Sequence, residues 1–150
     1  MKDGGHFFFG DTQVSATSTE LRVDLLSDNA DGSSSAVRLF VAPEFGRQAV
    51  QVLEQNLRQY EGRFGHIRVA RPGDAPEAPR RIRDSVETCV NMFVVTHTDS
   101  LFFFDFQLLL ARSRLRRAEV LSRVRAVTMP GHVPHLHARL RDALGRFPKP

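Results

Sequence analysis

The ten residues LFFFDFQLLL, from Leu101 to Leu110, are apolar except for Asp105 and Gln107. Side chains of a β-strand alternate between two faces, so a strand here would place its even-numbered residues, all apolar, on one face. A helix would instead bury Asp105 without a visible partner, at a substantial cost in free energy. The segment therefore predicts a strand that turns its even-numbered face to the core. Its more open face carries Leu101, Phe103 and Leu109 beside Asp105.

The same alternation predicts two hairpins and a lone strand. ELRVDLLS and SAVRLFVA flank the turn-rich loop DNADGSSS, which predicts a hairpin of Glu20–Ser27 with Ala36–Ala42. VNMFVVTHT is rich in strand-forming residues, so a strand over Val90–Thr96 should pair with Leu101–Leu109. HIRVA, which begins at His66, is expected to be the lone strand.

Apolar residues at spacings of three and four predict four helices. The first begins near Pro43, which is tolerated in a first helical turn, and ends near Gly62. A second is expected over Arg80–Cys89, where it gives way to the strand that follows. The tail predicts two more, with apolar stripes over Leu115–Val127 and Leu136–Phe147.

These elements predict an α+β domain over residues 19–150, with a mainly antiparallel sheet of about five strands and helices packed on one face. The 150 residues suit one domain with one core. Residues 1–18 are expected to be a flexible arm or a short strand, and 71–79 a Pro-rich surface loop. We find no internal repeat of fixed period by inspection of the sequence.

The apolar segments do not suit a membrane or an exported protein. The start, MKDGGHFFFG, lacks the charged and apolar regions of a signal peptide, and charges interrupt the longest apolar region, Met92–Ala111. The single cysteine, Cys89, excludes an internal disulfide and a multi-cysteine metal site, and we expect a buried, inert thiol. We therefore expect a soluble intracellular protein of the cytoplasm or nucleus, with no membrane partner.

The residue types of catalysis and metal binding occur without a known spacing. The segment GHVPHLHARL carries the densest group of possible ligands, His132, His135 and His137, but it matches no zinc motif, and an exposed first helical turn is the simpler interpretation. THTDS, residues 96–100, contains a histidine, an acid and a serine, which side by side in one turn cannot form a triad. Standard phosphate-binding loops are missing too. We expect no enzyme, no metal and no cofactor, and keep an unrecognised catalytic site as the third alternative.

Basic charge is concentrated in the second part of the chain. Residues 1–60 have a net charge of −3 and residues 61–150 one of +7. A helix over residues 111–125 would gather six arginines opposite an apolar stripe: Arg112, Arg114, Arg116, Arg117, Arg123 and Arg125. Such a face could follow a phosphate backbone, so nucleic-acid binding is the alternative function. The chain has 19 Arg and 2 Lys, however, and a GC-rich genome explains that bias equally well.

Apolar segments exceed what one core of this size needs. They are Phe7–Phe9, the second face of the strand with Leu101, Phe103 and Leu109, and the stripes of the tail. Exposed apolar patches commonly mark protein interfaces. The leading hypothesis is thus a non-enzymatic protein–protein interaction or scaffolding domain, a subunit or fragment of a larger assembly. Its partner would be another protein or further copies of the chain.

Overall fold

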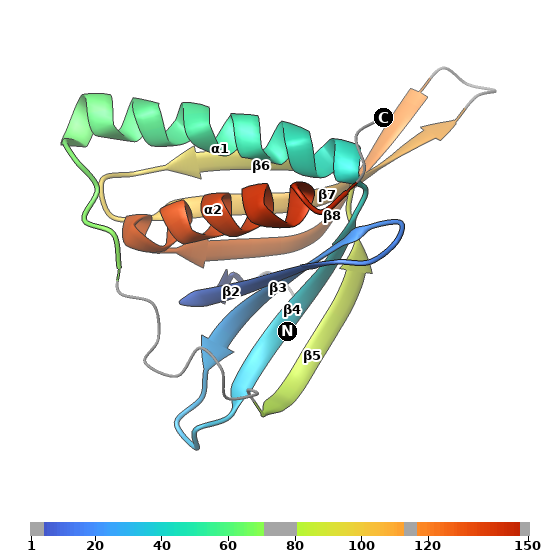
Figure 1. Cartoon of the computed structure of the whole chain (residues 1–150), viewed down its shortest axis with the longest axis horizontal. Coiled ribbons are helices and arrows are strands. Elements are labelled where there is room, and N and C mark those ends of the chain that lie inside the picture. The colour runs from blue at the N-terminus through green and yellow to red at the C-terminus, as the bar shows by residue number, and fades with distance from the viewer. Residues whose placement is uncertain (1–4, 71–80, 113–116, 148–150) are drawn as a thin grey trace.

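The chain folds into two four-stranded β-sheets and two α-helices, which lie side by side in front of the sheet that contains β6 (Met92–His97), β7 (Phe102–Arg112) and β8 (Arg117–Thr128) (Figure 1). The computed structural model describes residues 5–70, 81–112 and 117–147, and side chains are not described for residues 111–118. The first sheet has the order β2 (Asp11–Ala16), β3 (Leu21–Asp28), β4 (Ser34–Val41), β5 (Ile82–Cys89). The second has the order β1 (Phe7–Phe8), β8, β7, β6.

Each helical segment follows the last antiparallel strand of a sheet, and a proline begins both α1 (Pro43–Phe64) and the 3₁₀-helix that precedes α2 (Val133–Leu144). α1 ends before Gly65, whose φ of 92° suits glycine. The short 3₁₀-helix η1 (Pro130–His132) leads directly into α2. The predicted helices after Pro43 and around Leu136–Phe147 are therefore confirmed.

The α+β class is confirmed, but the predicted sheet is wrong in strand number and pairing. The described residues form eight strands in two mixed sheets, because β5 pairs with β4, and β1 with β8, in parallel. Both predicted hairpins exist, as β3–β4 and β6–β7. The lone strand predicted from His66 is not a strand.

Two of the predicted helices are strands. Residues 82–89 form β5, and the segment with the apolar stripe Leu115–Val127 lies mostly in β8. In β8 the alternation is plain, since Val124 and Ala126 are buried while Arg123 and Arg125 are exposed. Apolar residues at mixed spacings of two, three and four fit both periods, and partner strands far away in sequence decided between them. The 71–79 loop and residues 1–4 lie outside the described residues.

The fold consists of two units with the same β-β-β-β-α order, Phe7–Phe64 and Ile82–Leu144. In each unit three antiparallel strands precede the helix, and the first strand crosses to the other unit's sheet. The crossing is made by buried residues: Phe9 N donates to Val127 O at 3.0 Å, and Val90 N donates to Phe40 O at 3.2 Å. The units therefore exchange strands, and each completes the sheet of the other.

Equivalent residues of the two units follow a constant shift in position. Asp11 pairs with Leu26 in β2–β3, and Met92 pairs with Gln107 in β6–β7, a shift of 81 at both ends. After the β3–β4 turn the shift is 87, as between Val41 and Thr128. The second unit thus has six additional residues in its β7–β8 hairpin, where the register also shifts at Phe106/Gln107. The repeat escaped detection in the sequence because few equivalent positions are identical and the shift is not constant.

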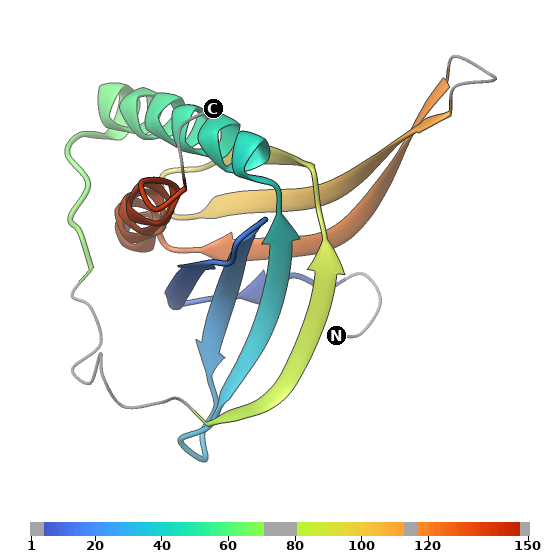
Figure 2. The same ribbon diagram turned by 45° about the vertical axis from the view of Figure 1, so that its right-hand side comes forward.

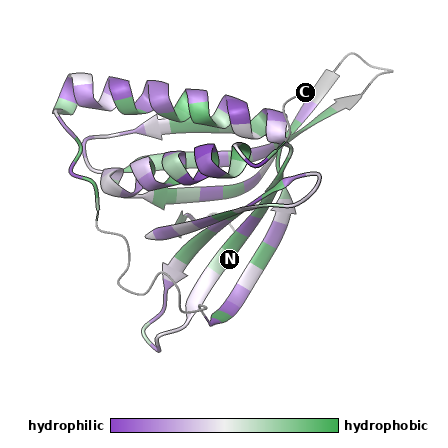
Figure 3. Cartoon of the chain, in the orientation of Figure 1, coloured by the Kyte–Doolittle hydropathy of each residue, from purple (hydrophilic) through white to green (hydrophobic). Residues whose placement is uncertain are grey.

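The core lies between the two sheets and the helices, and it receives the even-numbered side chains of β7. Phe102, Phe104 and Phe106 are 0%, 1% and 6% exposed, as their alternation predicts. Ring centroids of Phe104 and Phe106 are 5.7 Å apart, and Phe45 of α1 contacts Phe93 of β6 at 5.4 Å. In Figure 3 the strands change between hydrophobic and hydrophilic along their length, as expected for sheets with one covered face.

Cleavage of the chain between the units should leave them associated. If a protease site is inserted within residues 71–80 and cut, we expect the two fragments to co-elute at the mass of the intact chain. The reason is that both parallel ladders and the shared core join one unit to the other. Size-exclusion chromatography with light scattering is the measurement, and urea should be needed to separate the pieces. Free fragments in native buffer would contradict the strand exchange.

Candidate interaction surface

The outer face of the first sheet, away from the helices, is closed by an ion-pair cluster. Asp24 Oδ1 of β3 accepts from Arg38 Nε of β4 at 2.9 Å, and Arg38 Nη1 reaches Glu87 Oε1 of β5 at 3.3 Å. The Asp24 side chain is 8% exposed. Its hydrogen bond raises the pKa of the Arg38 guanidinium, against a smaller opposing effect of burial. The charged side chains of this cluster therefore find their partners within the first sheet.

The second sheet has the same acid and base but uses them differently. Asp105 and Arg125 face each other across β7–β8, at the positions equivalent to Asp24 and Arg38. Asp105 Oδ1 accepts from Ser122 Oγ at 2.6 Å, and Oδ2 accepts from Gln107 Nε2 at 2.9 Å. Among the described residues the Arg125 side chain has no hydrogen bond or ion pair.

The third member of the charge cluster is absent from the second sheet. The position equivalent to Glu87 is occupied by His6, whose ring lies edge-on to that of Phe103 at 6.1 Å. Arg125 is exposed, so its charge is available to a partner.

Apolar side chains surround this charged pair on the outer face of the second sheet. Phe8, Val94 and Val120 are 60%, 48% and 47% exposed, and Phe103 and Leu109 are half-buried. The first sheet has Cys89, Gln13 and Arg22 where the second has Phe8, Val94 and Phe103. We name the following residues the outer patch: Phe8, Val94, Phe103, Asp105, Leu109, Val120 and Arg125. Two sheets of one fold thus differ most on this face.

The β7–β8 hairpin extends beyond the body of the protein as an arm (Figures 1 and 2). Over the described residues β6 pairs with β7 only as far as Gln107, and β1 pairs with β8 only at Ala126 and Val127. Beyond these pairs the Asn91 side chain binds the β7 edge at Leu109, where Oδ1 accepts from Leu109 N at 2.7 Å and Nδ2 donates to Leu109 O at 3.0 Å. Leu109 pairs with Val120 on the arm's outer side, which continues the outer patch, and Leu110 is exposed on its other side.

Four of the six arginines predicted to share a helical face lie in described strands. Arg112 and Arg117 pair across the arm, and Arg114 and Arg116 lie outside the described residues. Arg123 stands at the irregular register of β8 and donates from Nε to Thr88 Oγ1 of β5 at 3.0 Å. The predicted helix is therefore wrong over Arg117–Thr128, which form β8.

Two of the three apolar residues predicted on the open face of LFFFDFQLLL lie on the outer face of β7. Phe103 and Leu109 belong to the outer patch, and Leu101 is half-buried in the turn before β7. The exposure of Val94 and Val120 was not predicted from the sequence, and Phe8 was predicted only as part of the apolar segment Phe7–Phe9. Val94 pairs with Asp105 across the predicted hairpin, so it lies on the same face as Asp105. Extending the alternation of β7 to its hairpin partner would therefore have predicted it.

The three tail histidines have separate partners. His135 Nε2 contacts Ala70 O at 2.5 Å, and His137 Nε2 lies 3.0 Å from Glu54 Oε1 of α1. Burial, followed by the charge of His135, lowers the pKa of His132. In the part of the chain that the structure describes, no three possible ligands are grouped to hold a metal ion.

The turn THTDS packs against the end of α1. Tyr60 Oη donates to Asp99 O at 2.5 Å, and the His97 ring stacks on Phe102 at 5.0 Å. Burial, and then the charge of Arg63, lowers the pKa of His97. Ser100 Oγ bonds to Asp99 Oδ1 at 3.0 Å, so neither nucleophile nor acid is directed at the imidazole. The turn interpretation fits this geometry.

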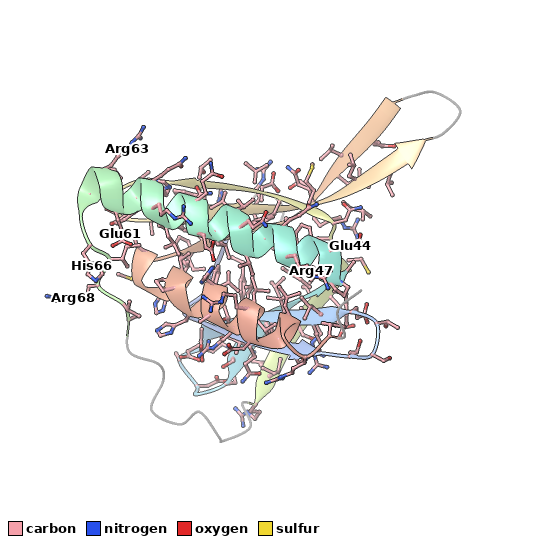
Figure 4. The ribbon with its side chains drawn as sticks, turned by 45° about the horizontal axis from the view of Figure 1, so that its top comes forward. Glu44, Arg47, Glu61, Arg63, His66 and Arg68 are labelled. Atoms are coloured by element: carbon pink, nitrogen blue, oxygen red, sulfur yellow. The ribbon has the colours of Figure 1, made fainter. Side chains whose placement is uncertain are left out.

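Two further features do not form a site. At the end of α1, Glu61 and His66 lie together while Arg63 and Arg68 point away from the body (Figure 4). Between the sheets and helices an apolar cavity of about 20 Å³ is large enough only for a water molecule. Cys89 is exposed on β5, so the predicted buried thiol is wrong. No helix in the described part of the chain is long and apolar enough to cross a membrane.

Comparison with known proteins concerns the first unit. Residues 9–69 match a family. It is described as a protein of unknown function (DUF3467), and the matched residues run from the crossing at Phe9 through β2, β3, β4 and α1. The similarity to DUF3467 therefore covers one unit and assigns no activity. No curated protein matches the chain.

Loss of Arg38 should destabilise the fold far more than loss of its equivalent. Arg38→Met leaves the buried Asp24 carboxylate without its main partner, so we expect the free energy of unfolding to fall by about 2 kcal/mol. Arg125→Met is the matched control and should change it by less than about 0.5 kcal/mol, because Arg125 is exposed. Urea unfolding at pH 7 measures both. Equal effects would contradict the difference between the two faces.

Proposed function

We propose that this protein is a non-enzymatic protein–protein interaction module, a scaffold or subunit of a larger assembly, that binds through the outer patch and the arm. The observation that supports the proposal is the exposure of Phe8, Val94 and Val120 on a sheet face that neither α1 nor α2 covers. Large exposed apolar patches are uncommon on monomeric proteins, and the cores of interfaces are enriched in aromatic residues and arginine. The exposed, single Cys89 fits a reducing intracellular setting.

A capture experiment with matched variants tests this proposal. Immobilised wild-type protein, Val94→Glu and Gln13→Glu are incubated with extract of the native source, and bound proteins are compared. Val94 and Gln13 occupy equivalent places in the two sheets, so each variant adds one charge to one face. We expect a protein bound by the wild type and by Gln13→Glu to be lost with Val94→Glu. Identical capture by all three proteins would refute the proposal.

Nucleic-acid binding is the second candidate, supported by the shape of the arm. A two-stranded β-ribbon fits the major groove of DNA, and this ribbon brings Arg112 and Arg117 to paired positions. The apolar Leu109, Leu110 and Val120 along the ribbon favour a protein partner instead. Titration of labelled duplex and single-stranded DNA at about 50 and 200 mM salt separates the two. Micromolar binding that weakens steeply with salt would favour nucleic acid.

A further inference from the structure

We infer that the partner of the outer patch is a second copy of this chain, and that two copies pack back to back through their second sheets. The inference rests on the proposed interaction function and deepens it. It follows from the chemistry of the patch, from its size, and from a comparison of the two sheets within one chain.

The charges of the outer patch are complementary to themselves. In a two-fold interface each residue i that contacts j is matched by j contacting i, so a patch must carry both halves of every pair. Asp105 and Arg125 are adjacent and opposite in charge on this face of the second sheet, where Phe103 and Val94 lie beside them and Ser122 and Gln107 bind the carboxylate. A two-fold axis between them sets Asp105 of each copy against Arg125 of the other.

The ion pair between Asp105 of one copy and Arg125 of the other would give the second sheet a charge pair that the first sheet forms within one chain. Arg38 is held by two carboxylates, those of Asp24 and Glu87. Arg125 occupies the equivalent position beside His6 in place of a glutamate, and Asp105 binds Ser122 and Gln107 instead of the guanidinium. A carboxylate from a second copy would therefore give Arg125 the partner that its equivalent already has.

The size of the face suits a weak but specific dimer. β7 and β8 have 11 and 12 residues, so their ribbon is about 36 Å long and about 10 Å wide, and β6 adds about 20 Å by 5 Å. The projected area is roughly 450 Å² for each copy and roughly 900 Å² for the pair, near the lower limit of specific interfaces. We expect a dissociation constant in the micromolar range.

Sedimentation equilibrium of the full chain between about 1 and 200 µM tests the inference. The wild type and Gln13→Glu should dimerise equally, because Gln13 is on the first sheet. Val94→Glu should weaken the dimer at least about tenfold, since it buries an unpaired charge in the interface. Circular dichroism melts check that each variant is folded. A wild type that stays monomeric at about 200 µM, or a dimer that both variants weaken equally, would overturn the inference.

A charge exchange tests the cross-pair directly. Arg125→Asp alone should weaken the dimer because it opposes two carboxylates across the axis. Adding Asp105→Arg to the same chain reverses both charges, restores both cross-pairs and should return the dissociation constant to within about threefold of the wild type. A double variant that dimerises no better than Arg125→Asp would contradict the proposed axis.

The outcomes distinguish this inference from the general function. A monomeric wild type that still captures a different protein, with capture lost in Val94→Glu, would overturn the second copy and keep the interaction function. A monomer that captures nothing through this face would remove both. DNA binding by the monomer, lost when Arg112 and Arg117 become glutamate, would assign the arm to nucleic acid instead.

Discussion

Phe104→Ala should lower the free energy of unfolding by about 3–5 kcal/mol, enough to unfold much of a marginally stable domain. Phe104 is fully buried, stacks against Phe106 and contacts the Phe9 ring at 5.9 Å. It also lines the small apolar cavity between the sheets and helices, so truncation enlarges an existing void rather than opening a new one. Urea unfolding followed by circular dichroism is the measurement.

The neighbouring Phe103→Ala is the matched control for Phe104→Ala. Phe103 has the same side chain on the same strand but points to the outer face, where it is half-buried. We expect a loss of about 1 kcal/mol, because part of the removed surface is already exposed to water and truncation at the outer face leaves no enclosed cavity. Equal losses for the two phenylalanines would contradict the face assignment of β7.

Gly46→Val should destabilise the protein by about 2 kcal/mol through overpacking. A Cβ at Gly46 would lie 2.5 Å from Leu21 Cδ1 and 3.2 Å from Leu144 Cδ2. Leu21 is fully buried at the start of β3, so it has no space into which to move. Thermal unfolding should report the loss as a lower melting temperature.

Gly62→Ala is the control for Gly46→Val on the same helix. A Cβ at Gly62 meets nothing within 4 Å, and the residue is exposed near the end of α1. Alanine has a higher helix propensity than glycine, so we expect the free energy of unfolding of this variant to rise by about 0.5–1 kcal/mol. A Gly46→Val protein as stable as Gly62→Ala would contradict the close packing of α1 against Leu21 and Leu144.

The strand register of LFFFDFQLLL illustrates what local pattern can settle. The even-numbered residues are all apolar and the odd-numbered face carries a carboxylate, so the strand is expected to turn its even-numbered face to the core. Burial of Phe102, Phe104 and Phe106 confirms this register. Asp105 is accordingly a half-buried acceptor for Ser122 and Gln107 and not a buried catalytic acid. The even-numbered Leu108 and Leu110 leave the core only because the arm extends beyond it, which alternation cannot indicate.

Other elements were decided by contacts distant in sequence. β5 is mostly exposed, carries charges on an edge strand, and exists because β4, about fifty positions earlier, offers it a parallel ladder. β8 is a strand and not a helix because β7 pairs with it over its whole length. The helix predicted to carry the basic face is thus absent over β8, and Val120 lies on the outer patch for the same reason.

By itself, the sequence determined the α+β class, both central hairpins, the helices after Pro43 and around Leu136, and the inward face of β7. These depend on periodicity and turn chemistry within short segments, where neighbouring residues carry the information. The tertiary structure alone decided the exchange of β1 and β5 between two equivalent units and the outer patch. The exchange depends on strands that meet across about 50 positions in β4–β5 and about 120 positions in β1–β8, and pairing energy at that range is a property of the assembled core rather than of any local pattern.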